Sequence, residues 1–243
     1  MNPQNKKRMK LYHYTSLENF WKIWVTKELL FASSRVPSNN DFFERNKSIS
    51  FVEETDPIDV LSYEMKKIRD YFKVLSQYKQ ISLTKDYSDG TLGCLSPMMW
   101  GLYANKAKGV CIELDSSILL NSDMSQVYHG DILYKNEFKS FVVTEESLQN
   151  VSDMDNFILN HKDAIFFQKH IHWLFENEYR IISKCRALVI SEAVDHIIVP
   201  DYDGNTTQLV RKMVSDDRKL LFLKMDEING TKKLNCYPFS HTT

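Results

Sequence analysis

Glycine is scarce in this sequence, which has 7 glycines in 243 residues. Loops that cradle phosphate groups are rich in glycine, because the backbone approaches a phosphate closely only where no side chain intervenes. With so few glycines, the sequence does not predict a phosphate-binding loop of this kind.

Cysteine is rarer still, and the four cysteines are scattered without any Cys-x-x-Cys pair. This pattern is typical of reduced, mostly buried thiols in a cytoplasmic protein. We therefore expect a cytoplasmic location and free thiols at Cys94, Cys111, Cys185 and Cys236.

Positive and negative charges nearly balance, since the formal net charge is −1. The chain thus has no overall field that would attract nucleic acid or an acidic membrane surface. Basic residues gather only in a short N-terminal arm, residues 1–9. No apolar run approaches the roughly 20 residues that span a bilayer, and Met1 is not followed by the apolar core of a secretory signal. We expect no membrane partner.

Hydrophobic residues make up 43% of the chain, which is enough to build a substantial core. We find no internal repeat, low-complexity tract or linker. The sequence therefore predicts one α+β domain with helical insertions at residues 10–235, between the basic tail 1–9 and a C-terminal tail 236–243.

Hydrophobic periodicity and turn residues place the secondary structure within this domain. Thr15 or Ser16 is a suitable N-cap for a helix after the first strand. Residues 35–44 are rich in turn formers and are expected to form a loop. Strands are predicted at 10–14, 28–34, 80–84, 109–115, 126–134, 179–183, 187–190 and 196–200, and further helices at 57–79, 100–107, 153–170 and 206–214.

His13 lies at the end of the first predicted strand, in the segment "LYHYTSLENF". A single histidine among aromatic residues commonly packs as a structural residue. At a strand end before a capped helix, however, its side chain can also face a cleft. Both interpretations stay open on the sequence alone.

The segment "WLFENEYRI", residues 173–181, carries two carboxylates and a guanidinium. If it is extended, Glu176, Glu178 and Arg180 lie on one face, because side chains alternate along a strand. The two glutamates would then be roughly 7 Å apart. This face is either solvated, with Arg180 bridging the glutamates, or part of a reactive site.

Other candidate sites have weaker signals. Tyr103, in "GLYANKAKG", either anchors a helix or offers a stacking surface to a flat ring. His170 and His172 are expected at a helix end where their side chains diverge, and no third ligand has suitable spacing. We therefore predict no metal site. No Gly-x-Ser-x-Gly motif marks a nucleophile.

Four segments together resemble the bacterial family catalogued as domain of unknown function 2971. They are "LYHYTSLENF" with "LLFASS", then "NNDFFE", "MWGLYANKAKGVCIELD" and "QKHIHWLFENEYRI". The resemblance covers roughly residues 11–200. One departure is Phe42, after Asn40-Asp41, where the family usually has proline.

A more distant resemblance is to the ADP-ribosyltransferase superfamily, whose members bind NAD on a split, mostly antiparallel β core. His13 is similar to the first-strand position of that superfamily, Tyr103 to the second position, and Glu176-x-Glu178 to the final motif. The second motif usually contains a serine, whereas here Lys106 and Lys108 flank an alanine.

This resemblance implies NAD as substrate, with Glu178 stabilising the oxocarbenium-like transition state and Tyr103 stacking on nicotinamide. It also implies that Glu176 orients or deprotonates the acceptor, an unknown macromolecule or nucleotide. The implied role is that of a toxin or phage-defence effector, with an antitoxin or regulatory partner and no metal.

The same resemblance implies that His13, with Tyr14 and Thr15, binds a ribose of NAD. Arg180 or Lys169 would meet the pyrophosphate or fix the glutamates. An alternative hypothesis is a nucleic-acid-processing toxin of the ribonuclease kind, or a nucleotide-binding sensor without NAD chemistry. A third is a non-catalytic interaction protein whose polar residues satisfy one another.

Overall fold

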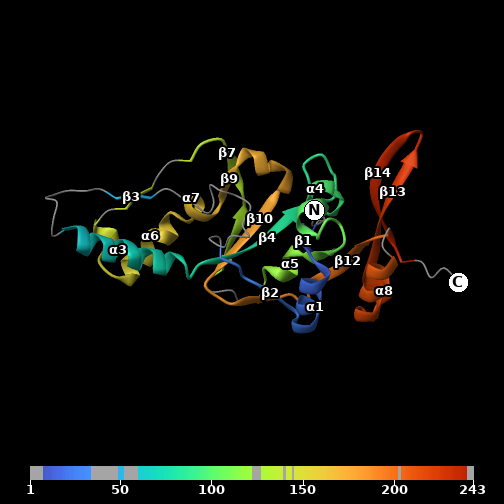
Figure 1. Ribbon diagram of the computed structural model, residues 1–243, viewed down its shortest axis with the longest axis horizontal. Coiled ribbons are helices and arrows are strands. Elements are labelled where there is room, and N and C mark those ends of the chain that lie inside the picture. Colours follow the sequence, from blue (N-terminus) through green and yellow to red (C-terminus); the bar gives the residue numbers. More distant parts are fainter. Residues whose placement is uncertain are drawn as a thin grey trace, which may run out of the picture.

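An eight-stranded sheet runs through the protein in the order β14-β13-β12-β5-β1-β4-β10-β6 (Figure 1). The computed structural model describes residues 8–33, 49–51, 60–121, 127–138, 141–143, 145–201 and 204–239. All neighbouring strands pair antiparallel except β12 and β13, which are parallel. The architecture is therefore a single mixed domain with a large, mostly antiparallel sheet.

The sheet strands are β1 (Lys10–Thr15), β4 (Lys79–Lys85), β5 (Val110–Asp115), β6 (Val127–Asp131), β10 (Glu178–Ser183), β12 (Val194–Pro200), β13 (Leu220–Ile228) and β14 (Thr231–Pro238). Three shorter pairs accompany it: β2 (Glu28–Leu30) with β11 (Ala187–Val189), β3 (Ile49–Phe51) with β8 (Phe141–Val143), and β7 (Leu133–Lys135) with β9 (Gln168–His170).

Local signals begin the helices. The Ser16 hydroxyl accepts a hydrogen bond from the Asn19 amide and caps α1, and Ser96 caps α4 in the same way, with Pro97 in its first turn. The helices are α1 (Leu17–Thr26), α3 (Val60–Leu75), α4 (Pro97–Tyr103), α5 (Ser116–Leu119), α6 (Val151–Asn160), α7 (Lys162–Phe166) and α8 (Gly204–Met213), and the 3₁₀ helices are η1 (Gly93–Leu95), η2 (Glu145–Leu148), η3 (Ile171–Glu176) and η4 (Asp217–Lys219).

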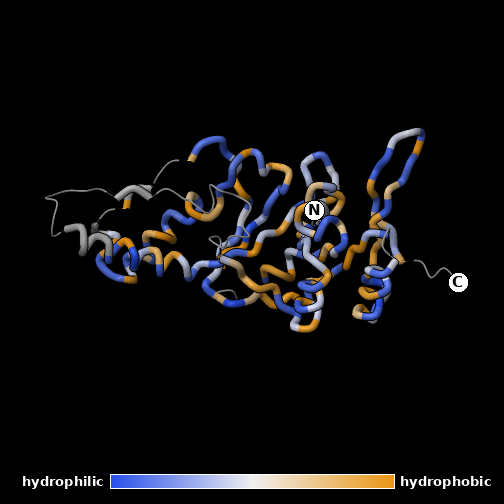
Figure 2. Tube along the Cα trace, in the orientation of Figure 1, coloured by the Kyte–Doolittle hydropathy of each residue, from blue (hydrophilic) through white to orange (hydrophobic). Residues whose placement is uncertain are grey.

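The core follows the sheet. Hydrophobic residues gather along its central strands (Figure 2), and β1 and β5 contribute fully buried Leu11, Ile112 and Leu114 to the main cluster. A second apolar cluster lies among α3, α6 and α7, at one end of the molecule. The β13–β14 hairpin projects at the opposite end (Figure 1).

Strands β1 and β4 pair over only part of their length. β1 pairs with β5 along its whole length, from Lys10 to Thr15, but with β4 only at Leu11 and Tyr12. β4 continues its pairing with β10 down to Lys79. The two strands therefore separate after Tyr12, and His13 and Tyr14 lie on the separated part of β1.

Several predicted elements differ from the structure. The helix expected at 153–170 is broken at His161, whose ring nitrogen hydrogen-bonds the Phe157 carbonyl (2.8 Å) at the end of α6; residues 168–170 instead form β9, which pairs with β7. Residues 173–181 are not extended throughout. Asn177 has φ 42°, a left-handed conformation that asparagine tolerates, and it ends η3 so that the strand starts only at Glu178.

The β13–β14 hairpin was not predicted at all. Asn229 and Gly230 both have positive φ (52° and 74°) and join two paired strands, which is the geometry that an Asn-Gly turn favours. Because β14 runs to Pro238, the boundary predicted between the domain and its C-terminal tail falls inside a strand.

The strand predicted at 126–134 is two strands, because β6 pairs with β10 in the large sheet whereas β7 pairs with β9 in a separate one. The helix predicted at 100–107 begins at Pro97 and ends at Tyr103. The other predicted strands and helices are present, with ends shifted by a few residues. The expected loop at 35–44, with Asn40, Asp41 and Phe42, lies outside the described residues, as do residues 1–7. At the edge of the predicted basic tail, Arg8 is ion-paired with Asp115 (3.0 Å). Among the helices that the structure describes, none has the length and apolar character to cross a bilayer.

Candidate functional site

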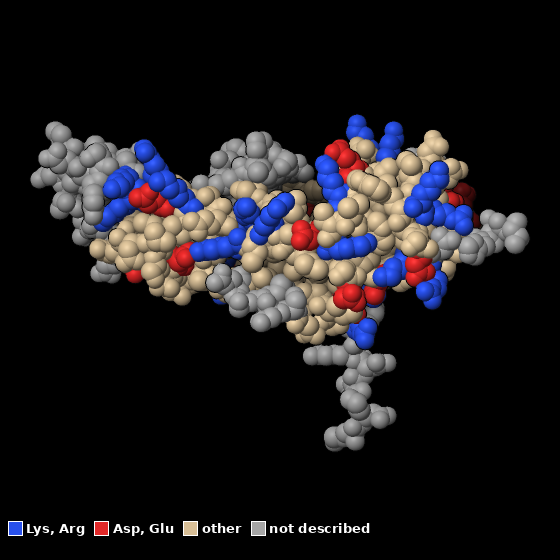
Figure 3. All heavy atoms as spheres, turned by 90° about the horizontal axis from the view of Figure 1, so that it is seen from below, with Lys and Arg blue, Asp and Glu red and all other residues tan. Residues whose placement is uncertain are grey.

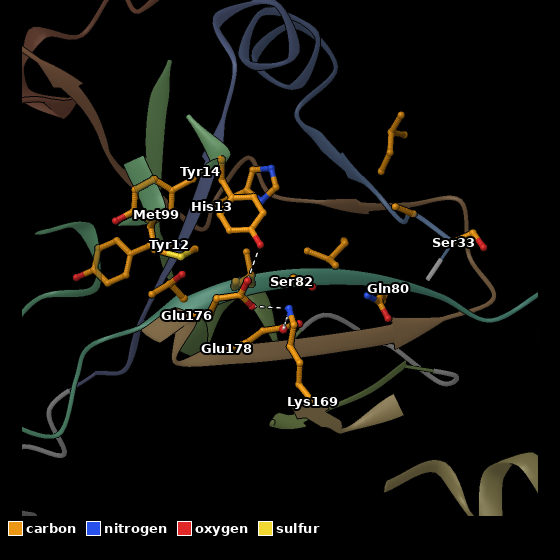
Figure 4. A pocket seen from close by; sticks show the side chains of 16 residues that line it. Tyr12, His13, Tyr14, Ser33, Gln80, Ser82, Met99, Lys169, Glu176 and Glu178 are labelled. Carbon is orange, nitrogen blue, oxygen red and sulfur yellow. Dashed lines mark hydrogen bonds and ion pairs between the residues drawn. The ribbon is translucent and has the colours of Figure 1, made fainter. Parts of the chain in front are cut away.

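A cavity of about 280 Å³ lies where β1 and β4 separate (Figure 4). Its walls come from strands, from α4 and from the segment around η3, so residues distant in sequence face one space. The lining residues are Tyr12, His13, Tyr14, Leu30, Ala32, Ser33, Gln80, Ile81, Ser82, Leu83, Thr84, Met99, Tyr103, Lys169, Glu176 and Glu178.

Two carboxylates and an ammonium group form the polar end of this cavity. The Lys169 Nζ lies 2.5 Å from Glu176 Oε2 and 3.3 Å from Glu178 Oε2, and bridges the two glutamates (Figure 4). All three side chains are buried, with at most 6% of each residue exposed. Buried carboxylates of this kind need partners, because an unpaired charge is costly away from water.

Glu178 is held by a second cation from its own strand. The Arg180 Nε and Nη2 donate to its two carboxylate oxygens at 2.7 and 2.9 Å, and Nη1 donates to the Phe166 carbonyl at 2.6 Å. The Ser82 hydroxyl adds a hydrogen bond. Burial alone would raise the pKa of Glu178, but the charges of Arg180 and Lys169 outweigh it and hold this pKa well below its usual range.

Glu176 behaves in the opposite way. Its pKa is raised, chiefly by burial and further by the charge of Glu178, against the opposing charge of Lys169. The Tyr103 hydroxyl donates a hydrogen bond to Glu176 Oε1 at 2.5 Å. Two carboxylates in one cavity thus have pKa values pushed apart, which suits one to remain ionised and the other to exchange a proton.

His13 faces the same cavity as a neutral group. Burial lowers its pKa to about 4, and a hydrogen bond to the Ser82 backbone acts in the other direction. At neutral pH the imidazole therefore carries no charge, and one ring nitrogen donates while the other accepts. Such a group can hold a hydroxyl by hydrogen bonding, but it contributes nothing to binding a phosphate by charge.

Tyr103 is positioned by the connection that follows it. Asn105, Lys106 and Ala107 all have positive φ (49°, 56° and 60°), an uncommon run of left-handed residues. The turn ends at Gly109, where an added Cβ would lie 2.1 Å from the Thr15 carbonyl oxygen. The end of α4 is thereby drawn against the end of β1, and Tyr103 and His13 line the same cavity.

Most of the residues predicted from the sequence line this cavity: His13, Tyr14, Tyr103, Lys169, Glu176 and Glu178. Thr15 and Arg180 do not. Thr15 is buried beside Gly109 at the end of β1, and the fully buried Arg180 is turned away by its bonds to Glu178 and Phe166. Lys169, rather than Arg180, bridges the two glutamates.

Sequence reasoning missed the β4 side of the cavity. Ser82 hydrogen-bonds Glu178 and His13, yet "QISLT" was interpreted only as a strand. The available signal was the alternation of Gln80, Ser82 and Thr84, which puts three polar side chains on one face of a strand. What gives that face a function is the pairing of β4 with β10, in which Ser82 lies opposite Arg180.

In the part of the chain that the structure describes, no group of three or more His, Cys, Asp or Glu side chains is arranged to hold a metal ion. His170 and His172 do approach each other, with ring centroids 4.5 Å apart. Their contact is a hydrogen bond from the His172 amide to His170 Nδ1 (3.3 Å).

Residues 99–181 match the family described as Protein of unknown function (DUF2971). The matched segment contains Tyr103, Lys169, Glu176 and Glu178 from the cavity, which supports the resemblance to that family seen in the sequence. Comparisons with curated proteins and with solved structures found no match.

Proposed function

We propose that this protein cleaves NAD at the bond between nicotinamide and ribose and transfers the ADP-ribose group to an acceptor. The observation that carries this proposal is the pair of buried glutamates with separated pKa values in a cavity opposite a neutral histidine. The sequence resemblance to ADP-ribosyltransferases led to the same residues.

Glu178 would stabilise the transition state. When nicotinamide leaves with the electrons of the C–N bond, positive charge develops on the ribose, and a fixed carboxylate stabilises that charge more than it stabilises the neutral sugar. The low pKa of Glu178 keeps it ionised although it is buried. Arg180 and Lys169 take part by holding its position.

Glu176 would serve the acceptor. Its raised pKa brings it closer to neutrality, where a general base works best, and it would take the proton of the attacking group as the new bond to ribose forms. The Tyr103 hydroxyl orients the Glu176 carboxylate (2.5 Å), while the aromatic ring offers a stacking surface to nicotinamide.

The size of the cavity indicates how much of NAD enters it. At about 280 Å³ it lies just below the usual range for ligand pockets, roughly 300–1,000 Å³. It would accommodate the nicotinamide and its ribose, with His13 bonded to a ribose hydroxyl, while the rest of the dinucleotide extends outside. A transferase of this kind would suit a toxin or defence effector restrained by a partner.

Phosphate chemistry of the ribonuclease kind fits the cavity less well. A neutral His13 with a pKa of about 4 is far from the range in which a general acid works at neutral pH. On the face shown in Figure 3, basic and acidic side chains are interspersed, without a continuous basic stretch. A nucleotide sensor would bind its ligand through the same contacts as the transferase but would not catalyse a reaction.

Nicotinamide release from NAD tests the proposal. In Glu178→Gln the side chain keeps its size but loses its charge, and we expect release to slow by about 100-fold or more, as when one electrostatic transition-state contact is lost. Glu113→Gln is the matched control, because Glu113 is also a buried glutamate paired with a lysine, Lys10 at 2.6 Å, but lies outside the cavity.

The two variants separate the possible outcomes. Equal losses in Glu178→Gln and Glu113→Gln would assign the effect to general destabilisation and contradict the catalytic role of Glu178. NAD binding by the wild-type protein without any nicotinamide release, with or without cell extract, would favour the sensor. Circular dichroism of each variant checks that it is folded.

A further inference from the structure

Two cysteines far apart in the sequence meet beside the cavity wall. The Sγ atoms of Cys94 and Cys236, 142 positions apart, lie 3.7 Å from each other. Cys94 belongs to η1 and is buried, whereas Cys236 belongs to β14 and is half-buried. Their thiols form the contact between the projecting C-terminal hairpin and the segment that leads into α4.

The η1 segment is bonded directly to residues that line the cavity. The hydroxyl of Tyr14, which lines the cavity, donates to the Gly93 carbonyl at 2.6 Å. The indole of Trp100, in α4, donates to the Cys94 carbonyl at 2.7 Å. Asp86 Oδ1 accepts hydrogen bonds from the Gly93 amide (3.0 Å) and from the Tyr12 hydroxyl (2.9 Å). A constraint placed on Cys94 therefore acts on the wall that contains Tyr12 and Tyr14.

We propose that Cys94 and Cys236 are an oxidation site, forming a reversible disulfide that fixes the C-terminal hairpin to the cavity wall when the protein meets a peroxide. The Sγ separation has to shorten from 3.7 Å to about 2.05 Å. Both side chains pack in the same apolar cluster, and the proposal requires their rotation to bring the two sulfur atoms together.

The reaction proceeds in two balanced steps. The Cys236 thiol reacts with hydrogen peroxide to give a sulfenic acid and one water molecule. The Cys94 sulfur then attacks the Cys236 sulfur, the S–O bond breaks, and the hydroxyl leaves as water with the Cys94 proton. Two thiols are oxidised by two electrons in total, and the peroxide is reduced to two water molecules.

Exposure sets this order of events. The hydrogen bond to Cys236 and burial both raise the pKa of the Cys94 thiol, so Cys94 forms little of the thiolate that reacts with peroxide. Cys236 is half-buried and within reach of solvent. Cys236 is therefore oxidised first, and the Cys94 thiol reacts second, with the sulfenic acid on Cys236.

The other two cysteines provide internal comparisons. Cys185 is exposed, on the turn between β10 and β11, and would be oxidised without contributing to this link. Cys111 is fully buried in the same apolar cluster as the pair, so peptide mapping has to distinguish a Cys94–Cys236 link from a Cys111–Cys236 link.

The test is oxidation of the reduced full-length protein with hydrogen peroxide, followed by alkylation of the remaining thiols and digestion without reductant. We expect one cross-linked peptide pair containing Cys94 and Cys236, which dithiothreitol removes. Cys185→Ser should leave this pair unchanged, whereas Cys94→Ser and Cys236→Ser should each abolish it. Hydrogen exchange in η1 and β14 should slow on oxidation.

Alkylation of both Cys94 and Cys236 after peroxide treatment, or a link through Cys111 instead, would overturn the proposal. A variant at buried Cys94 loses packing contacts as well as the thiol, so the wild-type peptide map provides evidence that does not depend on any variant. None of these measurements uses NAD, so their outcome is separate from that of the proposed transferase activity.

Discussion

Glu178 keeps its charge inside the protein only because two cations accompany it. The residue is 3% exposed, and Arg180 and Lys169 replace the water that would otherwise solvate its carboxylate. A carboxylate fixed in this way needs no reorganisation when positive charge appears nearby, which is the condition for electrostatic stabilisation of a transition state. The charged state of Glu178 therefore depends on both Arg180 and Lys169.

Removing one of these cations should therefore destabilise the folded protein. Arg180→Met leaves Glu178 buried with Lys169 alone, and we expect the free energy of unfolding to fall by about 3–5 kcal/mol, as for other broken buried ion pairs. The double variant Arg180→Met/Glu178→Leu should recover a large part of this loss. Urea denaturation of both measures the difference, and a loss below about 1 kcal/mol in the single variant, the scale of exposed pairs, would contradict the arrangement.

His13 should make the protein sensitive to mild acid. Its pKa of about 4 when folded lies below its ordinary value of 6.5, so between these pH values the unfolded chain binds a proton that the folded protein does not. The free energy of unfolding should then fall as the pH drops from 6.5 to 4, by at most about 3 kcal/mol. Glu176, with its raised pKa, acts in the opposite sense.

Comparison with a variant isolates the contribution of His13. His13→Asn should reduce the slope of stability against pH between 6.5 and 4. Thermal or urea unfolding across this range provides the measurement. An unaltered slope in His13→Asn would show that the imidazole is protonated as readily in the folded protein as in the unfolded chain.

At the scale of elements, the connection from α4 to β5 holds the cavity together. Gly109 passes so close to the Thr15 carbonyl that a Cβ has no room, because that contact is with backbone. We expect Gly109→Ala to destabilise the protein by about 1–3 kcal/mol, the cost of overpacking, and to weaken ligand binding by displacing Tyr103.

Gly101, in α4, is the matched control for this substitution. No atom lies within 4 Å of its added Cβ, so Gly101→Ala should stabilise the helix, by about 0.5–1 kcal/mol. Thermal unfolding compares the two variants. Equal effects of the two alanines would mean that the crossing at Gly109 is not as tight as the structure indicates.

Elements with a local cause were predictable, and those with a distant cause were not. The helix that follows Ser16 has its cap and its apolar spacing within one short segment. The Asn229-Gly230 turn is also local, and the hairpin around it was available to sequence reasoning although missed. By contrast, nothing near residue 168 shows that β9 replaces the end of a helix, because its partner β7 lies at 133–135.

At the scale of the whole molecule, the candidate site exists because one pair of neighbouring strands separates. His13, Tyr103 and Glu178 were selected from motifs, and the cavity brings them together. The role of Ser82 and the inward position of Lys169 were not predicted, since they depend on the pairing of β4 with β10 and of β7 with β9, strands that are distant in the sequence. Sequence motifs can identify candidate reactive residues, but the order of the strands in the sheet determines which side chains surround them.

If the separated strands receive NAD, the ligand should stabilise the entire fold. A ligand that binds only the native state raises the free energy of unfolding by about 2.7 kcal/mol at a concentration 100-fold above its Kd. We expect NAD to raise the midpoint of thermal unfolding of the wild-type protein, and this shift to be smaller in His13→Ala, which loses the bond to ribose. The same shift should persist in Glu178→Gln, where binding survives and only the rate falls. A shift produced by RNA or a free nucleotide, but not by millimolar NAD, would refute the transferase assignment and favour the nucleic-acid or sensor alternative.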